Sequence, residues 1–284
     1  TAENINRRRE WMLDPEIKGV GIYDAERTLA RVLAYRVWSD QRRGWRYTNP
    51  NLEQLGLIKA SYLGIDDLSA DMEVLSDINS EGFSINPEQL KEIYGILLDT
   101  FRKGLAVTTD SLDRTNIDSV SQKSRQLLRD PWSISQNETA KVSSYLMIQA
   151  PRRENTGLRG ESIIIRGGSR SALGKQINKE KYWGRRLKGD EYTALLEKLL
   201  RAAAEYQLVR RVSTPFDIDG WQLSANAIRL VHESTPPEEN NQYFIELYTS
   251  LSESLATGGD GIFGIEGREH TAQVDQERRE WREW

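Results

Sequence analysis

Apolar side chains recur at helical spacing in the first half of the chain. Leu29, Leu33 and Val37 follow one another at i, i+4 and i+8, which predicts an amphipathic helix with Asp24 as its N-cap. A second helix is predicted between residues 86 and 104, because an asparagine N-cap and a terminal glycine enclose one apolar stripe. This stripe consists of Leu90, Ile93, Tyr94, Leu97 and Phe101.

The second half of the chain combines helical and strand patterns. A short helix is predicted over 169–177 and a longer one over 189–207. Two short apolar runs, 208–209 and 221–223, enclose a turn at Pro215 and predict a β-hairpin. Helix, helix and hairpin is the order of a winged helix, in which one helix enters the major groove and the wing contacts the backbone or minor groove.

A polar, glycine-containing stretch at 150–161 is the predicted domain boundary. The expected fold is α+β and mostly α-helical. It comprises a helical domain at 1–150, a winged-helix-like domain at 158–232 and a C-terminal segment at 240–284.

Composition excludes several classes of protein. The chain is 38% hydrophobic and 29% charged, which is typical of a soluble protein with a core. It has no cysteine, so disulfides, thiolate metal sites and cysteine nucleophiles are excluded. No apolar run is long enough to span a bilayer and no signal peptide is recognisable, so we expect a cytoplasmic protein without a membrane partner.

Charge is distributed unevenly. Residues 151–188 hold eleven Lys and Arg against three acids, whereas 233–284 hold twelve acids against four Arg. A local basic excess favours nucleic-acid phosphates as partners. The same distribution also suits a solvated loop beside a solvated acidic tail, and both interpretations stay open.

The candidate nucleic-acid contacts come from the winged-helix-like region. The cations would neutralise phosphates rather than read bases, and an aromatic residue on the hairpin would act as a wedge. These candidates are Arg170, Lys175, Arg185, Arg186, Arg210, Arg211 and Trp221. Core packing is the more favoured interpretation of Trp221, because it lies in a predicted strand.

The stretch from Ile163 to Ile177 is similar in sequence to a phosphate-binding loop (P-loop) but differs from that motif in two respects. Five residues separate Gly168 from Gly174 where the P-loop has four, and Gln176 stands where it has Ser or Thr. No DEAD/DEAH-like box, nucleophile elbow or metal-binding histidine pair is present either. The chain therefore shows no active site of its own, and no cofactor is expected in it.

Four segments resemble one family in their order and spacing. They are 28–58 (TLARVLAYRVWSDQRRGWRYTNPNLEQLGLI), 128–134 (LRDPWSI), 241–252 (NQYFIELYTSLS) and 267–284 (GREHTAQVDQERREWREW). Together they resemble large bacterial DEAD/DEAH-box helicases of superfamily 2 that carry a C-terminal cysteine-rich domain. The resemblance covers nearly the whole chain.

The resemblance places the chain inside the second RecA-like lobe. Residues 1–232 would be an insertion containing the helical domain and the winged helix, and the chain would return to the lobe from about Asn240. The Walker A and DEAH boxes, and with them ATP and Mg²⁺, would belong to the parent protein. This chain would then be an excised piece without the ATPase machinery.

The resemblance also adds three candidate residues near the C-terminus. In the family, the segment matching 269–273 lies on the nucleic-acid side of the lobe, so His270, Thr271 and Gln273 are candidates for contacts with the nucleic-acid backbone. Alternatively, Thr271 and Gln273 only help Asp275 to start the following helix.

The predicted function is an accessory region that holds DNA or RNA for a helicase motor, with the rest of the helicase chain as a second partner. The alternative is an interaction module, in which the winged helix packs against the motor or a partner protein. A free-standing winged-helix transcription factor is less favoured, because it leaves the first 150 residues without a role.

Overall fold

The computed structural model describes residues 12–42, 51–149, 163–232, 246–247 and 249–250. The helices of this part are α2 (Gly21–Gln41), α3 (Ile65–Ala70), α4 (Met72–Asn79), α5 (Pro87–Lys103), α6 (Arg114–Leu127), α7 (Ala172–Ile177), α8 (Glu180–Trp183) and α9 (Gly189–Glu205). Two 3-10 helices, η1 (Asp110–Leu112) and η2 (Ala225–Ala227), connect them to strands. The strands are β1 (Ile58–Tyr62), β2 (Val107–Thr108), β3 (Tyr145–Met147), β4 (Ile164–Arg166), β5 (Val209–Val212), β6 (Gly220–Ser224) and β7 (Ile228–His232).

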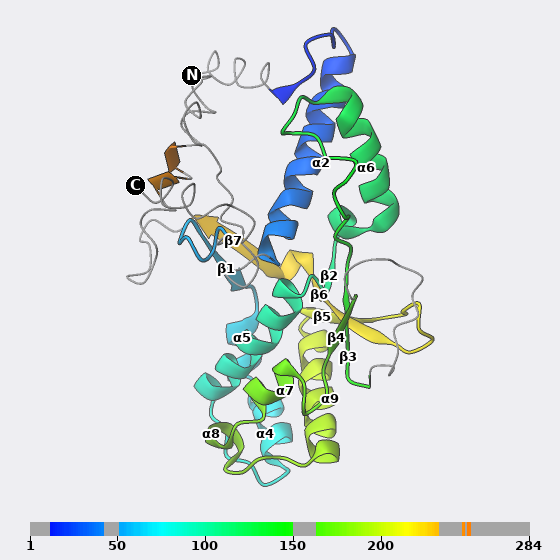
Figure 1. The fold of residues 1–284 in the computed structure, drawn as a ribbon. Helices are drawn as coiled ribbons and strands as arrows, with labels where there is room; N and C mark the ends of the chain where they lie inside the picture. Colours follow the sequence, from blue (N-terminus) through cyan, green and yellow to red (C-terminus); the bar gives the residue numbers. More distant parts are fainter. Residues whose placement is uncertain (1–11, 43–50, 150–162, 233–245, 248, 251–284) are drawn as a thin grey trace, which may run out of the picture.

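The described part is mixed α and β and mostly helical, as the sequence predicts (Figure 1). One sheet has the order β2-β6-β3-β4, with β5 also paired to β6. Strands β5 and β6 form an antiparallel hairpin, whereas β2 is parallel to β6 and β3 is parallel to β4. A separate two-stranded sheet pairs β1 with β7 in antiparallel register, from Ile58↔His232 to Tyr62↔Ile228.

Strands from both sides of the predicted boundary at 150–161 belong to the larger sheet. Strands β2 and β3 precede the boundary, and β4, β5 and β6 follow it. The main hydrophobic core likewise includes Leu146 from one side and Leu173 from the other. The predicted domains 1–150 and 158–232 therefore share one sheet and one core. Of the predicted segment 240–284, the structure describes only 246–247 and 249–250.

Helix α5 lies at the centre of the main core and follows its predicted pattern. The Asn86 side chain accepts a hydrogen bond from the Gln89 N–H, and the Gln89 side chain accepts one from the Asn86 N–H. This capping box, with Pro87 at the first helical position, explains where the helix begins. The whole predicted stripe is fully buried: Leu90, Ile93, Tyr94, Leu97 and Phe101.

Helix α2 differs from its prediction in two respects. It begins at Gly21 with Val20 at the N-cap position, so Asp24 lies in the first turn and the predicted Asp24 cap is wrong. Helix α6 packs against a face that is rotated from the predicted stripe, so Leu33 and Val37 are 43% and 36% exposed. The buried residues of this helix are Ala25, Thr28, Leu29, Val32, Tyr35, Ser39 and Gln41.

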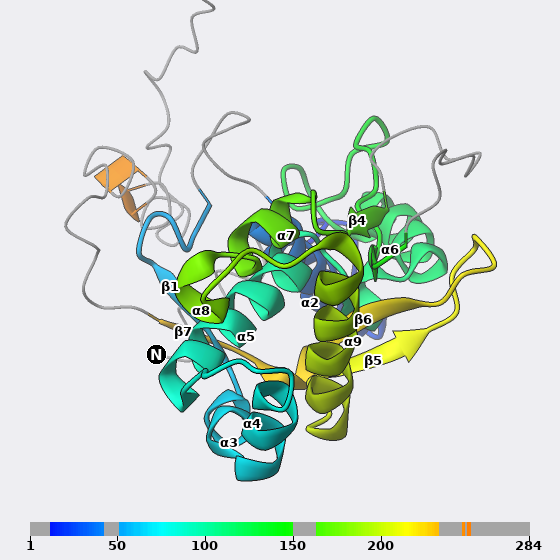
Figure 2. The same ribbon diagram turned by 90° about the horizontal axis from the view of Figure 1, so that it is seen from below.

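The predicted order of helix, helix and hairpin is present. Helix α7 begins after Ser171, whose Oγ accepts a hydrogen bond from the Gly174 N–H, and the four-residue α8 stands between α7 and α9. The hairpin strands are longer than predicted, at 209–212 and 220–224. Both views place α9 beside this hairpin, which extends away from the helical layer (Figure 1, Figure 2).

Candidate nucleic-acid interface

Two local contacts fold the chain around α7 back onto the start of α9. The Asn178 side chain donates to the Leu187 carbonyl at 3.0 Å and accepts from the Leu187 N–H at 2.8 Å. A Cβ atom added at Gly189 would lie 3.9 Å from Ser169 Oγ, so the turn before α7 approaches the first residue of α9. Three predicted contact cations next to these contacts form what we call the α7–α9 surface: Arg170, Lys175 and Arg186.

The three cations of the α7–α9 surface share one electrostatic property. Each is exposed, and among the described residues none has a carboxylate partner. Their charges are therefore not neutralised by any carboxylate in this part of the structure. A cation of this kind is available to a phosphate group, because no ion pair within the protein has to break before it binds.

The stretch that resembles a P-loop has a packing role. A Cβ atom at Gly174 would lie 2.5 Å from the carbonyl oxygens of Gly168 and Ser169, so α7 can approach the preceding turn only with glycine there. Helix α7 is six residues long, and Gln176 stands where a magnesium-binding hydroxyl would be needed. These residues do not fit a nucleoside triphosphate.

Arg185 differs from its neighbour Arg186, because it forms a two-pronged ion pair. Its Nη1 and Nη2 lie 2.8 and 3.1 Å from the Glu191 carboxylate oxygens. Hydrogen bonds from Arg185 and from the Lys188 N–H lower the pKa of Glu191 to about 2. The pair stabilises the first turn of α9, where a carboxylate is favoured.

The hairpin cations Arg210 and Arg211 point to opposite faces of the sheet, as successive strand residues do. Arg210 Nε donates to Thr108 Oγ1 at 2.8 Å. Arg211 Nε lies 2.9 Å from the Asp219 carboxylate, at the other end of the hairpin turn. Trp221 stands opposite Arg211 in the strand register and is partly buried against the main core.

A cavity of about 310 Å³ lies between α9 and the hairpin, and we call it the α9–hairpin cavity. It is lined by Ile148, Gln149, Glu197, Arg201, Arg211, Ile218, Asp219 and Trp221. Two of the predicted site residues, Arg211 and Trp221, meet here. The sequence reasoning missed Gln149, Glu197 and Arg201. The i, i+4 spacing of Glu197 and Arg201 on the outer face of a predicted helix could have indicated the last two.

A larger cavity, of about 540 Å³, lies between α2, α6 and the loop that follows α6. Arg36 and Arg125 contribute cations to its wall. Arg36 is paired with Glu138, and the wall also includes the Asp130 carboxylate, so the charges of this cavity nearly cancel. It does not select for an anion.

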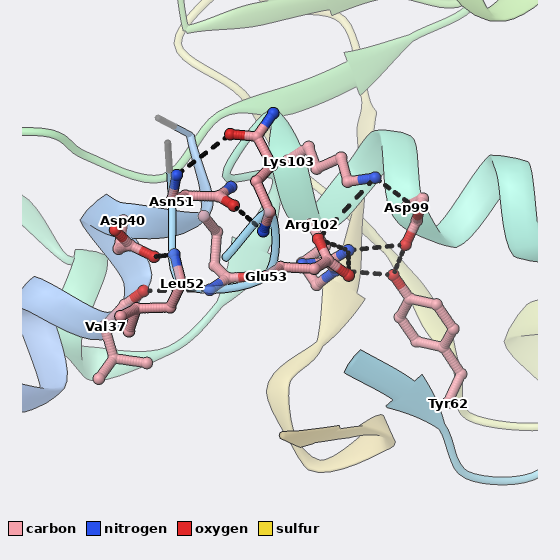
Figure 3. Close-up of polar contacts among 11 residues, drawn as sticks. Val37, Asp40, Asn51, Leu52, Glu53, Tyr62, Asp99, Arg102 and Lys103 are labelled. Carbon is pink, nitrogen blue, oxygen red and sulfur yellow. Dashed lines mark hydrogen bonds and ion pairs between the residues drawn. The ribbon is translucent and has the colours of Figure 1, made fainter. Parts of the chain in front are cut away.

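Arg102, which the sequence analysis did not single out, is the centre of a buried polar cluster in the described part of the chain (Figure 3). Its side chain has no exposed surface. Its guanidinium donates to Glu53, Asp99 and Tyr62 at 2.9–3.0 Å and to the Gln41 side chain. We call Arg102 and these four partners the Arg102 cluster. It joins α2, the segment before β1, β1 itself and α5.

Within the Arg102 cluster the ionised states are fixed by neighbours. Burial by itself would raise the pKa of Asp99, but hydrogen bonds from Lys103 and Tyr62 and the charge of Arg102 lower it below its usual value. Burial raises the pKa of Tyr62 well above its usual value. The tyrosine therefore remains a hydrogen-bond donor to Asp99, at 2.6 Å.

The candidates His270, Thr271 and Gln273 lie outside the described residues. Within the described residues, no group of three or more His, Asp or Glu side chains is arranged to hold a metal ion. No helix in the described part combines the length and apolar character that crossing a membrane requires.

Comparison with known proteins adds no relative. No family model matches the chain, and neither a curated protein nor a solved structure matches it.

Proposed function

We propose that this chain is a nucleic-acid-binding accessory region that holds DNA or RNA through its phosphates. The observation that carries the proposal is the α7–α9 surface, whose three exposed cations lie on α7, just before α7 and just before α9. They belong to a helix–helix–hairpin unit of the kind found in winged-helix proteins. Neutralising phosphates with such cations releases counterions, which drives binding without sequence preference.

The outer face of α9 argues against phosphate contact along this helix. This face carries more acids than cations: Asp190, Glu191, Glu197, Lys198, Arg201 and Glu205. Lys198 is engaged by Asp77 and Glu81 of the α4 region. A helix with this charge distribution would meet repulsion in a groove lined by phosphates. The cations of the α7–α9 surface instead favour phosphate, because none of them has a carboxylate partner in the described residues.

The resemblance to DEAD/DEAH-box helicases supplies the proposed context. In that context the chain would hold a strand or duplex while the motor elsewhere in the parent protein hydrolyses ATP with Mg²⁺. The rest of the helicase chain would be the second partner.

The test is fluorescence anisotropy with labelled single-stranded and duplex DNA across a salt series. The wild-type affinity should fall with salt, and replacing Arg170, Lys175 and Arg186 together by Ala should weaken binding. It should also reduce the slope of log K against log salt by about 0.9 for each lost duplex contact. The matched control replaces three exposed cations on α2 and α6 by Ala: Arg27, Arg114 and Lys123. Equal losses in the two triple variants would contradict a localised site.

A second candidate function is the packing of a partner protein. It is favoured by the second apolar face of α2, which α6 does not cover: Ile22, Tyr23, Leu33 and Val37 are all at least 36% exposed. Helix faces of this kind suit docking to another polypeptide. If the wild-type chain binds neither DNA nor RNA at low salt, this function replaces the first.

A further inference from the structure

The α9–hairpin cavity has a charge balance that disfavours phosphate as its ligand. Two arginines and two carboxylates line it, and each arginine faces a carboxylate: Arg211 with Asp219 at 2.9 Å, and Arg201 with Glu197 at 3.7 Å. The remaining lining residues are Ile148, Gln149, Ile218 and Trp221. An aromatic wall, apolar side chains, an amide and paired charges suit a flat, neutral ring with polar edges.

We propose that the α9–hairpin cavity accepts one unpaired nucleobase, which stacks against Trp221. The proposal rests on the proposed function and names the state of the nucleic acid that the chain recognises. Base stacking on aromatic side chains is tolerant of sequence, because every base has a π-face. The base edge would meet the Gln149 amide and the carboxylates of Glu197 and Asp219, which accept hydrogen bonds from the N–H groups of a base, such as N3–H of thymine.

The backbone holds Trp221 in place for this role. Its strand is paired on both sides, with Arg211 opposite it on β5 and Leu146 opposite it on β3. The side chain packs partly against the main core and also lines the cavity. Stacking on a ring that is fixed in this way needs little ordering of the protein, which favours affinity.

The arginines at the cavity can serve the sugar-phosphate groups next to the base. Their side chains are 74% exposed for Arg201 and 67% exposed for Arg211. Surface ion pairs of this kind are weak, and Arg201 is 3.7 Å from its carboxylate, so the Arg201 guanidinium can turn toward a phosphate at small cost.

The size of the cavity suits one base rather than a base pair. Its volume, about 310 Å³, lies at the small end of ligand pockets, which span about 300–1,000 Å³. A base inside a duplex is also stacked and paired, so it would first have to leave the helix. The cavity therefore predicts a preference for single strands and for strand junctions over continuous duplex.

The experiment compares three labelled probes of equal length: oligothymidylate, the same backbone with abasic residues, and duplex DNA. Wild-type protein should bind oligothymidylate more tightly than the abasic strand. Trp221→Leu should weaken binding to oligothymidylate about 5- to 150-fold, the range expected for loss of one stacked base. It should leave the affinity for the abasic strand and the salt slope unchanged. Trp132→Leu, in the separate α2–α6 core, is the matched control.

A second variant keeps the proposal testable if Trp221→Leu fails to fold. Gln149 is exposed at the cavity, so Gln149→Leu removes the amide that faces the base edge without touching the core. It should reduce the preference for oligothymidylate over the abasic strand. If wild-type protein binds oligothymidylate and the abasic strand equally, the proposed base site is contradicted. The proposed phosphate binding at the α7–α9 surface is then unaffected. If wild-type protein binds neither these probes nor an RNA strand of the same length, both proposals are wrong.

Discussion

Two regions of this protein use arginine in opposite ways. In the Arg102 cluster, one buried guanidinium meets two carboxylates, a phenol and an amide from four segments of the chain. On the α7–α9 surface, Arg170 and Arg186 are exposed, and no carboxylate in the described residues pairs with them. The residue type is the same, and its surroundings decide its role.

The contrast has an energetic basis. A buried charge is tolerated only when its partners replace the lost hydration, so Arg102 is committed to the fold. An exposed cation keeps its hydration, contributes little to folding and remains available to an anionic ligand. We therefore expect stability to depend on the Arg102 cluster and binding to depend on the α7–α9 surface.

The largest expected effect is that of Arg102→Met on stability. The substitution removes the buried cation from Glu53 and Asp99, which keep only the exposed Lys103 as a cationic partner, and should cost about 3–5 kcal/mol of unfolding free energy. Urea denaturation measures this cost. The control Arg186→Met should change the free energy by no more than about 0.5 kcal/mol, as is usual for exposed sites. Similar losses in the two variants would remove the distinction between the regions.

Gly174→Ala tests whether α7 needs close contact with the preceding turn. The added Cβ would meet two backbone carbonyl oxygens at 2.5 Å, which cannot move as a side chain can. We expect a loss of about 1–3 kcal/mol in urea denaturation. Gly95→Ala in α5 is the control, since a Cβ there has no atom within 4 Å. It should stabilise the protein by about 0.4–1 kcal/mol. Stabilisation by Gly174→Ala would show that this packing is dispensable.

A smaller effect should separate two adjacent arginines in DNA binding. Arg186→Ala should weaken duplex binding and lower the salt slope by about 0.9, the value for one phosphate contact. Arg185→Ala should change the slope less, because Arg185 is already paired with Glu191. Anisotropy titrations over a salt series measure both slopes. A larger change for Arg185→Ala would assign the phosphate contact to the paired residue instead.

The smallest expected effect is a change in titration at the start of α9. The pKa of Glu191 is lowered to about 2 by Arg185 and by the Lys188 N–H, from an ordinary value of 4.5. The lowered pKa means that this contact stabilises the folded state above pH 4.5, and that the contribution is lost as pH falls toward 2. Arg185→Ala should raise the pKa of Glu191 toward 4.5 in a carboxyl NMR titration. An unchanged pKa would show that the backbone N–H is sufficient.

Several features of the candidate site followed from local sequence patterns. The hairpin around Pro215, the long helix ending near residue 205 and the exposed cations before it were all expected from spacing and turn residues. The ion pair between Arg185 and Glu191 was not, although Glu191 stands at the third position of α9, where a carboxylate commonly caps a helix. The α9–hairpin cavity could not be predicted from the sequence, because Gln149, Arg201 and Trp221 come from three separate segments of the chain.

The sequence by itself determined the elements whose signals are local. Helix α5 has its capping box and its full apolar stripe within 18 residues, from 86 to 103, so its limits and its buried face were readable. Only the tertiary structure decided which face of α2 is covered, since both faces are apolar and α6 packs against one of them. It also decided that strands on both sides of residues 150–162 share a sheet, and that residues 41, 53, 62 and 99 meet at Arg102. The physical reason is that periodicity reports the neighbours one turn or one strand position away, whereas burial and charge pairing depend on contacts between distant segments.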